Sequence, residues 1–314
     1  MAPRREFAYG FPRLPQPAPE PSTLSAIRYL LAVDGGGTSC RARLADLSGA
    51  VLGEGRAGSA NLTAGVEPVR AEVLAAAAAA YTAAGLDAAA MAASAACLGL
   101  AGANASGLGE SFLATPFPFG RIRLVTDAEI ACRGAHRGGD GGILVLGTGS
   151  QGVVAVGGRL VTVGGWGFAL SDGGSGAVVG RAALRRALLA HEDLSPASDF
   201  TRAVMARFDD RPQTMLAFAL KAAPRDWAAF APLVFEAAAA GDPVARGLAD
   251  EAAGDVAALV GRVRDLGARS IALMGGLAAF YRPMMPAPLV PLLAEPAGDA
   301  LDGALALARA MAAD

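Results

Sequence analysis

The sequence predicts an α/β protein built from two domains of duplicated topology with a cleft between them. Its 314 residues suffice for two ordinary domains. Apolar residues make up 53% of the chain against 18% charged residues, so a large core can form. Two segments, starting near residues 30 and 142, repeat one pattern: a strand, a glycine turn and two more strands. Because ligands favour clefts between domains, we expect both glycine turns to face one ligand.

The first glycine turn lies between two predicted strands, residues 30–33 and 40–44. It consists of Asp34, Gly35, Gly36, Gly37 and Thr38. The first strand is a short apolar run, and in the second strand apolar residues alternate with arginines, as on a half-buried strand. Glycine turns expose N–H groups that can cradle a phosphate, and Asp34 is placed to hold a hydrated Mg²⁺. The alternative is an ordinary β-hairpin with a Gly-rich turn.

The rest of the first half alternates helices and strands. Strands are predicted at residues 50–55, 95–100 and 121–127, and helices at 66–84, 107–113 and from 128 onwards. Asp127 lies where the last of these strands passes into a helix. An aspartate there can cap the helix. Because a helix N-terminus keeps a carboxylate ionised, it can also accept the proton of an attacking hydroxyl in phosphoryl transfer.

The second half repeats this opening. Strands are predicted at residues 142–146, 151–156 and 159–163, around a second turn made of Gly147, Thr148, Gly149 and Ser150. Glycine-rich loops follow at 164–167 and 171–176. The remaining predictions are helices at 177–191, 198–207 and 228–266 (broken at Pro232 and at 241–243), a strand at 270–274, a turn through Gly275 and Gly276, and a closing helix at 299–312.

Charge and lysine content exclude several classes of protein. A net charge of −2 and a pI of about 5.8 argue against a nucleic-acid or membrane-surface partner. Lys221, the only lysine, lies between Leu220 and Ala222. The chain therefore has neither the Gly-Lys-Ser/Thr phosphate loop nor the strand lysine of a protein kinase, and a nucleotide would have to be bound in another way.

The N-terminal segment and the cysteines bear on location. Residues 1–27 contain six prolines and no apolar signal-peptide core, so we expect a Pro-rich, disordered extension. No stretch reads as a transmembrane helix. The three cysteines, Cys40, Cys97 and Cys132, form no Cys-x-x-Cys pair, which is typical of a reduced cytoplasmic protein.

Six short motifs occur in an order that resembles the actin-like ATPase superfamily of sugar kinases, Hsp70 and actin. They are residues 34–38, 126–128, 146–150, 164–167, 171–176 and 274–276. Over about residues 28–312 the chain is most similar to the N-acetylglucosamine and glucosamine kinases of the BadF/BadG/BcrA/BcrD ATPase family. The resemblance implies two ribonuclease H-like domains: residues 28–133, closed by the helix at 299–312, and residues 134–298.

The resemblance also implies roles for individual residues. Residues 34–38 would form a first phosphate loop, with Asp34 near Mg²⁺ through water, and residues 147–150 a second. Gly275 and Gly276 would form the adenosine motif, where side chains must be absent. Asp127 would be the catalytic base. The positions near the sugar would be Asn61, Asp127, Trp166, Gly167 and Asp172.

Three of the side chains near these motifs have a plainer explanation as well. Asp172 can be a turn aspartate that bonds its own backbone, or a carboxylate that accepts sugar hydroxyls. Trp166 can be packed in the core, or its ring can line a sugar site. Glu129, two residues after Asp127, is expected to be solvated.

The resemblance implies an ATP- and Mg²⁺-dependent kinase that phosphorylates O6 of glucosamine or N-acetylglucosamine, with glucosamine preferred. We expect a cytoplasmic homodimer with no nucleic-acid or membrane partner. One alternative is the ATPase activator of a 2-hydroxyacyl-CoA dehydratase, which shares the fold and binds an iron–sulfur cluster through two cysteines per subunit. Cys132 is suitably placed for one ligand, but no second cysteine follows it. The other alternative is a sugar or nucleotide sensor without turnover.

Overall fold

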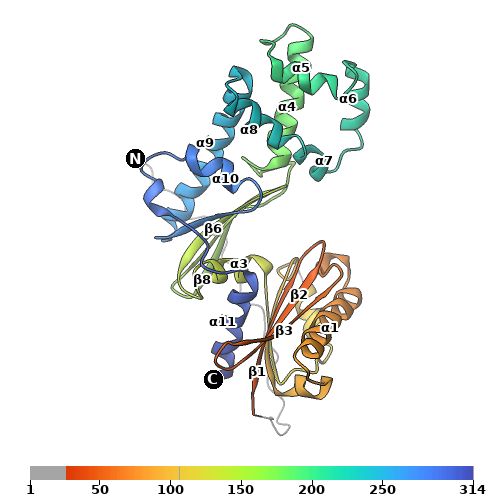
Figure 1. Cartoon of the computed structure of the whole chain (residues 1–314), viewed down its shortest axis with the longest axis vertical. Helices are drawn as coiled ribbons and strands as arrows, with labels where there is room; N and C mark the ends of the chain where they lie inside the picture. Colours follow the sequence, from red (N-terminus) through yellow and green to blue (C-terminus); the bar gives the residue numbers. More distant parts are fainter. Residues whose placement is uncertain (1–25, 106, 314) are drawn as a thin grey trace. The chain divides into compact units, whose positions relative to one another are not determined.

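The computed structural model describes residues 26–105 and 107–313, and the chain divides into two compact units (Figure 1). Of the described residues, unit 1 comprises 26–141, 155–161 and 296–313. Unit 2 comprises Gly142–Val154 and Thr162–Glu295. The N-terminal extension is predicted for residues 1–27. Its residues 1–25 lie outside the described residues.

The first sheet has the strand order β3-β2-β1-β4-β5. Its strands are β1 (Tyr29–Gly35), β2 (Cys40–Asp46), β3 (Val51–Ala57), β4 (Ser94–Leu100) and β5 (Arg121–Val125). The first three form an antiparallel meander, whereas β4 and β5 run parallel to β1. The strands predicted in the first half are therefore confirmed.

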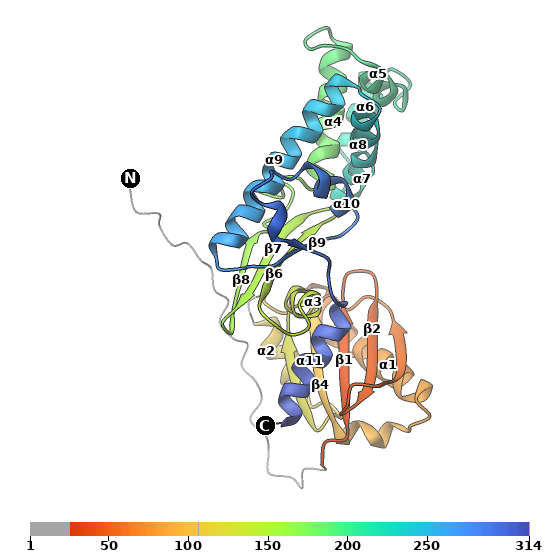
Figure 2. The ribbon, with the colours of Figure 1, turned by 60° about the vertical axis from the view of Figure 1, so that its left-hand side comes forward.

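Helices cover both faces of this sheet (Figure 2). Helix α1 (Val66–Ala83) packs on one face, and α3 (Asp127–Ala135) and α11 (Ala300–Ala313) pack on the other. Alternate residues of β1 enter two different cores: Leu31 and Val33 contribute to the α1 side, and Leu30 and Ala32 to the α11 side. Burial on both faces explains why β1 is a continuous apolar run.

Short elements link the main ones in the first unit. They are the 3₁₀ turns η1 (Leu62–Ala64) and η2 (Ala88–Ala93), and helix α2 (Leu108–Leu113).

The second sheet has the order β10-β9-β6-β7-β8. Its strands are β6 (Gly141–Leu146), β7 (Ser150–Val156), β8 (Arg159–Gly164), β9 (Ile271–Met274) and β10 (Leu293–Ala294). Read from the opposite edge, this is the order of the first sheet, with a three-strand opening followed by two strands that arrive after helices. The predicted duplication is confirmed, although β10 was not predicted because two residues carry no pattern.

Helices make up the rest of unit 2. They are α4 (Gly176–His191), α5 (Asp199–Ala206), α6 (Pro212–Ala219), α7 (Pro224–Ala228), α8 (Ala231–Ala239), α9 (Pro243–Asp265) and α10 (Ala278–Tyr281), followed by the 3₁₀ turns η3 (Arg282–Met284) and η4 (Val290–Leu292). The helix predicted over 228–266 starts earlier, at Pro224, and is interrupted between α7 and α8, ahead of Pro232. Pro232 lies in the first turn of α8, where proline is tolerated because the backbone N–H that it lacks would have no helical partner there.

Among the described residues, no single helix has the length and apolar composition of a membrane span. One bent pair, Pro224–Ala239 with Pro243–Asp265, meets that length and composition test only when its two parts are joined across a 116° bend.

Candidate active site

Two predicted carboxylates lie at one edge of the first sheet. In the parallel strands β1, β4 and β5, Asp34 pairs with Gly99 and Gly99 pairs with Val125, so the carboxyl ends of the strands share an edge. Asp34 is near that end of β1, and Asp127 begins α3 just after β5. The carboxyl edge of strands in α/β sheets is where ligands bind.

Asp127 is half-buried and is the first residue of α3, not its cap. The cap is Thr126, whose Oγ1 accepts the Glu129 N–H at 3.0 Å. Asp127 accepts the Ala128 N–H at 2.9 Å. Burial nevertheless raises the pKa of the Asp127 carboxyl, and the negative charge of Asp34 adds to this against the Ala128 hydrogen bond. The helix N-terminus favours the ionised carboxylate, as expected from the sequence, but burial outweighs it. A raised pKa makes this carboxylate a stronger proton acceptor.

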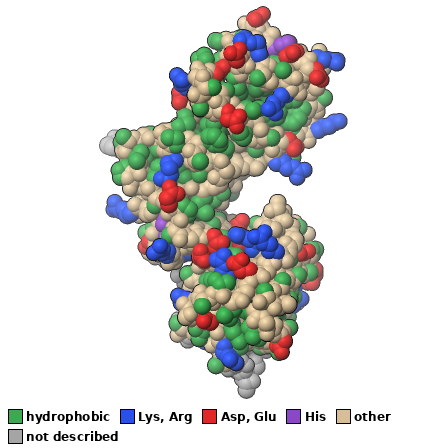
Figure 3. All heavy atoms as spheres, viewed as in Figure 1, with side chains coloured by type: hydrophobic (Ala, Val, Ile, Leu, Met, Phe, Trp, Pro, Cys, Tyr) green, Lys and Arg blue, Asp and Glu red, His purple; other side chains and the backbone are tan. Residues whose placement is uncertain are grey.

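The Asp34 carboxylate is held by Arg41, its cross-strand partner on β2. Its Oδ2 accepts from Arg41 Nη2 at 2.6 Å and from Nε at 3.2 Å. Its Oδ1 accepts no hydrogen bond from the described part of the chain, so that oxygen fits a water of a hydrated Mg²⁺. Arg41 also lies 3.6 Å from Asp299. Figure 3 shows acidic and basic side chains gathered on unit 1 close to where Figure 1, in the same view, draws α3.

The glycines of the first turn fall into two groups. A Cβ on Gly35 would lie 2.5 Å from Leu100 Cδ2, so packing inside the protein requires glycine there. A Cβ on Gly36 would approach no atom closer than 4.0 Å, and one on Gly37 would meet nothing within 4 Å. The fold therefore does not explain Gly36 and Gly37. The open space beside them, next to exposed Thr38, leaves room for a phosphate.

Asn61 lies beside this turn because the Ala60 N–H donates to the Gly36 carbonyl at 2.9 Å. Its Oδ1 accepts from the Thr63 N–H at 3.0 Å and from the Thr63 hydroxyl at 2.9 Å, which caps η1. The side-chain oxygen is thus used within the turn, and the amide nitrogen is the group left to meet a sugar hydroxyl.

In unit 2, the second glycine turn is bonded to the start of α4. The carbonyls of Gly147 and Thr148 accept from the N–H groups of Gly176 and Ala177 at 2.8 and 3.1 Å. A Cβ on Gly147 would meet nothing within 4 Å, and the Thr148 side chain is exposed. As in the first turn, packing leaves open space where a phosphate could approach the backbone.

Asp172 is a buried carboxylate, 8% exposed, in the loop before α4. Its Oδ1 accepts from the Gly167 N–H at 3.3 Å and from the Ser171 hydroxyl at 3.1 Å. Its Oδ2 lies 2.9 Å from where a Cβ on Gly149 would be, and accepts no hydrogen bond from the described residues. A carboxylate fixed at one oxygen and open at the other can accept a sugar hydroxyl or amine.

Trp166 is 61% exposed, which excludes the first of its two alternatives, packing in the core. Its backbone N–H donates to the Ser171 hydroxyl at 2.9 Å. The flanking Gly165 and Gly167 have φ of 74° and 88°, which glycine adopts readily. The sharply turned loop therefore presents a large ring at the surface, where it can cover a sugar face.

The two glycines of the predicted adenosine turn, Gly275 and Gly276, have different reasons to be glycine. Gly275 has a φ of 94°, and a Cβ there would lie 2.4 Å from the Leu146 carbonyl oxygen. The Leu277 N–H donates to the same carbonyl at 3.1 Å. A Cβ on Gly276, by contrast, would meet nothing within 4 Å. Gly275 is explained by the fold, and Gly276 keeps space open beside it.

Two charged residues near Asp127 and Asp34 were missed or misjudged from the sequence. Glu129 was expected to be solvated, but its side chain is 14% exposed and lies 3.5 Å from Arg123, because Arg123 on β5 faces the first turn of α3. Arg41 was assigned only to a strand pattern. Pairing the two strands of the hairpin around the glycine turn places Arg41 opposite Asp34, so the hairpin register was the signal that could have identified it.

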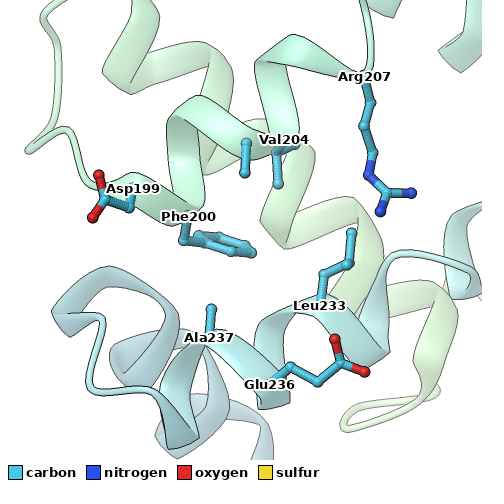
Figure 4. Close-up of a pocket in the computed structure, with 8 residues that line it drawn as sticks. Asp199, Phe200, Val204, Arg207, Leu233, Glu236 and Ala237 are labelled. Carbon is cyan, nitrogen blue, oxygen red and sulfur yellow. The ribbon is translucent and has the colours of Figure 1, made fainter.

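A groove of about 300 Å³ lies between α5 and α8 (Figure 4). Phe200 and Val204 line it from α5, and Leu233 from α8, with Arg207 and Glu236 at its rim. It includes none of the predicted site residues, so it is separate from the site described above.

Comparison with known proteins gives one family and several relatives. The model of the BadF/BadG/BcrA/BcrD ATPase family matches residues 31–284. The glucosamine kinase GspK of Vibrio cholerae is 37% identical over 282 residues, which cover 90% of this chain and 96% of the relative.

Two solved structures extend the comparison. A candidate N-acetylglucosamine kinase from Chromobacterium violaceum is 36% identical, with a TM-score of 0.79 over 90% of this chain and 100% of that one. A second candidate N-acetylglucosamine kinase, from Porphyromonas gingivalis, is 18% identical with a TM-score of 0.63 over 90% of this chain and 99% of that one, and supports the fold alone.

Proposed function

This chain belongs to the BadF/BadG/BcrA/BcrD ATPase family, and from that premise we propose that it is an ATP-dependent kinase of an amino sugar. The fold is the duplicated ribonuclease H-like fold that the motifs predict. We further propose glucosamine as the preferred acceptor over N-acetylglucosamine, because the relative of 37% identity that spans nearly the whole chain carries that name. The phosphorylated group would be the primary hydroxyl at O6.

The observation that carries the proposal is the position of Asp127. It is a half-buried carboxylate with a raised pKa, at the same sheet edge as Asp34 and the open glycine turn. Phosphoryl transfer passes through a loose transition state, so a base needs mainly to orient the hydroxyl and then take its proton. We assign this role to Asp127.

The residues present fit a nucleotide phosphate chain and its metal. The N–H groups of Gly37 and Thr38 and those of Thr148 and Gly149 would bind phosphate oxygens, because the N–H groups of Gly36 and Gly147 already donate within their turns. Oδ1 of Asp34 would accept from a water on Mg²⁺. Mg²⁺, when bound, would supply neutralisation of the phosphate charge. Arg41 keeps the Asp34 carboxylate in one orientation.

The residues assigned to the sugar are Asn61, Trp166, Gly167 and Asp172 together with Asp127. The free Oδ2 of Asp172 supports this, because a carboxylate accepts strongly from hydroxyl and ammonium groups. A cationic amine at C2 of glucosamine suits such an oxygen better than an acetamide. We propose that the reaction takes place in the cytoplasm and that the protein is a homodimer.

Substitution of Asp127 by Asn tests the proposal. We expect kcat to fall by about 10²-fold or more, as when a general base is removed, while ATP still binds. Asp199→Asn is the matched control, because Asp199 also begins a helix behind a hydroxyl cap but is 97% exposed. Full activity in Asp127→Asn would rule out the assigned base.

A further inference from the structure

Helix α10 connects the predicted adenosine turn to the loop that holds Asp172. It begins two residues after Gly276 and ends at Tyr281, whose side chain is 0% exposed. The Tyr281 hydroxyl donates to the Gly174 carbonyl at 2.5 Å. Burial raises the pKa of this hydroxyl, so it stays protonated as a donor. The bond is made two residues beyond Asp172 in the same loop.

The loop needs such support because its backbone is strained. Asp172 has a φ of 64°, in the left-handed region that is unfavourable for a residue with a side chain, whereas Gly174 adopts its φ of 73° readily. A conformation of this kind persists only where the surroundings fix it. Two buried hydroxyls do so: Ser150 Oγ donates to the Gly173 carbonyl at 2.8 Å, and Tyr281 holds the next carbonyl.

We propose that Tyr281 is a positioning residue for sugar recognition, because its hydroxyl fixes the 171–176 loop with the free oxygen of Asp172 over Gly149. The inference rests on the proposed function, which assigns Asp172 to the sugar. The role of the hydroxyl is distinct from that of the ring. The ring packs edge-on against Phe235, with 5.2 Å between the two ring centroids.

Tyr281→Phe removes the hydroxyl alone and leaves the buried Gly174 carbonyl without this donor. We expect the KM for the amino sugar to rise about tenfold, equivalent to about 1.4 kcal/mol. The KM for ATP should change by less than about twofold, because the turn at Gly275 keeps its own hydrogen bond from Leu277 to Leu146.

Tyr81→Phe is the matched control. Tyr81 is 1% exposed in unit 1 and its hydroxyl bonds Ser94, so the same atom is lost from an equally buried site. We expect a lower Tm and unchanged KM values for both substrates. A second variant, Phe235→Leu, disturbs the ring contact but keeps the Tyr281 hydroxyl, and should lower Tm while leaving the sugar KM close to that of the wild type.

The measurement is steady-state ADP release by the full chain, with sugar and ATP varied in turn. A rise confined to the sugar KM in Tyr281→Phe supports the proposal. An unchanged sugar KM in an active Tyr281→Phe enzyme, or an equal rise in both KM values, overturns it and leaves the proposed function standing. A wild type that releases no ADP with any amino sugar overturns the proposed function and this inference with it.

Discussion

The buried charge of the Asp127 carboxylate lowers the stability of the folded protein, and the fold does not require that charge. A carboxyl whose pKa is raised on folding stabilises the protein at low pH, where it is protonated, and that contribution is lost as the pH rises through the raised pKa. At neutral pH the ionised group therefore destabilises the fold. Functional sites commonly carry such penalties because activity requires them.

It follows that Asp127→Asn should retain or raise the Tm at neutral pH while it lowers kcat. Asparagine keeps an oxygen for the Ala128 N–H and lacks the buried charge. Thermal unfolding of both proteins by circular dichroism gives the comparison. A Tm several degrees lower in the variant would mean that Asp127 mainly supports the structure.

The same pKa shift predicts the acidic side of the pH profile. Since the base must be ionised, kcat/KM should fall on acidification with an apparent pKa above 3.8, the ordinary value for aspartic acid. Burial is the first cause and the charge of Asp34 contributes. Initial rates at saturating ATP across the acidic range test this, and an apparent pKa at or below 3.8 would contradict it.

At the scale of the element, the open glycine turns separate function from packing. Gly37→Ala adds a methyl group that touches no protein atom, so the Tm should hardly change. We expect the KM for ATP to rise by about tenfold, because the methyl group occupies space meant for a phosphate. If the KM for ATP of Gly37→Ala stays close to the wild-type value while the Tm is unchanged, the turn does not approach the nucleotide.

Gly247→Ala provides the control for that substitution. Gly247 lies inside α9, and a Cβ there also meets nothing within 4 Å. Alanine in a helix interior should stabilise the protein by about 0.5–1 kcal/mol and leave the KM for ATP unchanged.

Elements were predictable where one local pattern decides them. The strands around both glycine turns follow from apolar runs, and the end of α8 before Asp242 follows from a proline and a capping aspartate. The partner of Asp34 and the burial of Glu129 depend on register and on packing between β5 and α3. The open oxygen of Asp172 depends on a left-handed backbone angle. None of these three features produces a repeating pattern of apolar and polar residues, so the sequence alone does not predict them.

At the scale of the whole molecule, the cysteines bear on the dehydratase-activator alternative. Cys40, Cys97 and Cys132 are all buried, and burial raises the pKa of the Cys132 thiol to about 11. A cluster ligand must be a thiolate, so this environment disfavours one. We expect anaerobically purified protein to be colourless and to contain no stoichiometric iron. A cluster that is lost in Cys132→Ser and kept in Cys97→Ser would revive the alternative.

This chain transfers the γ-phosphoryl group of ATP to an amino sugar. The most direct test is a coupled ADP-release assay with Mg²⁺ATP and glucosamine, N-acetylglucosamine, glucose, mannose or N-acetylmannosamine, with a control lacking sugar. We predict ADP release that depends on an amino sugar, is fastest with glucosamine, and falls by about 10²-fold or more in Asp127→Asn. ADP release that is independent of sugar, or no ADP release with any of the five sugars while ATP binds, would contradict an amino-sugar kinase.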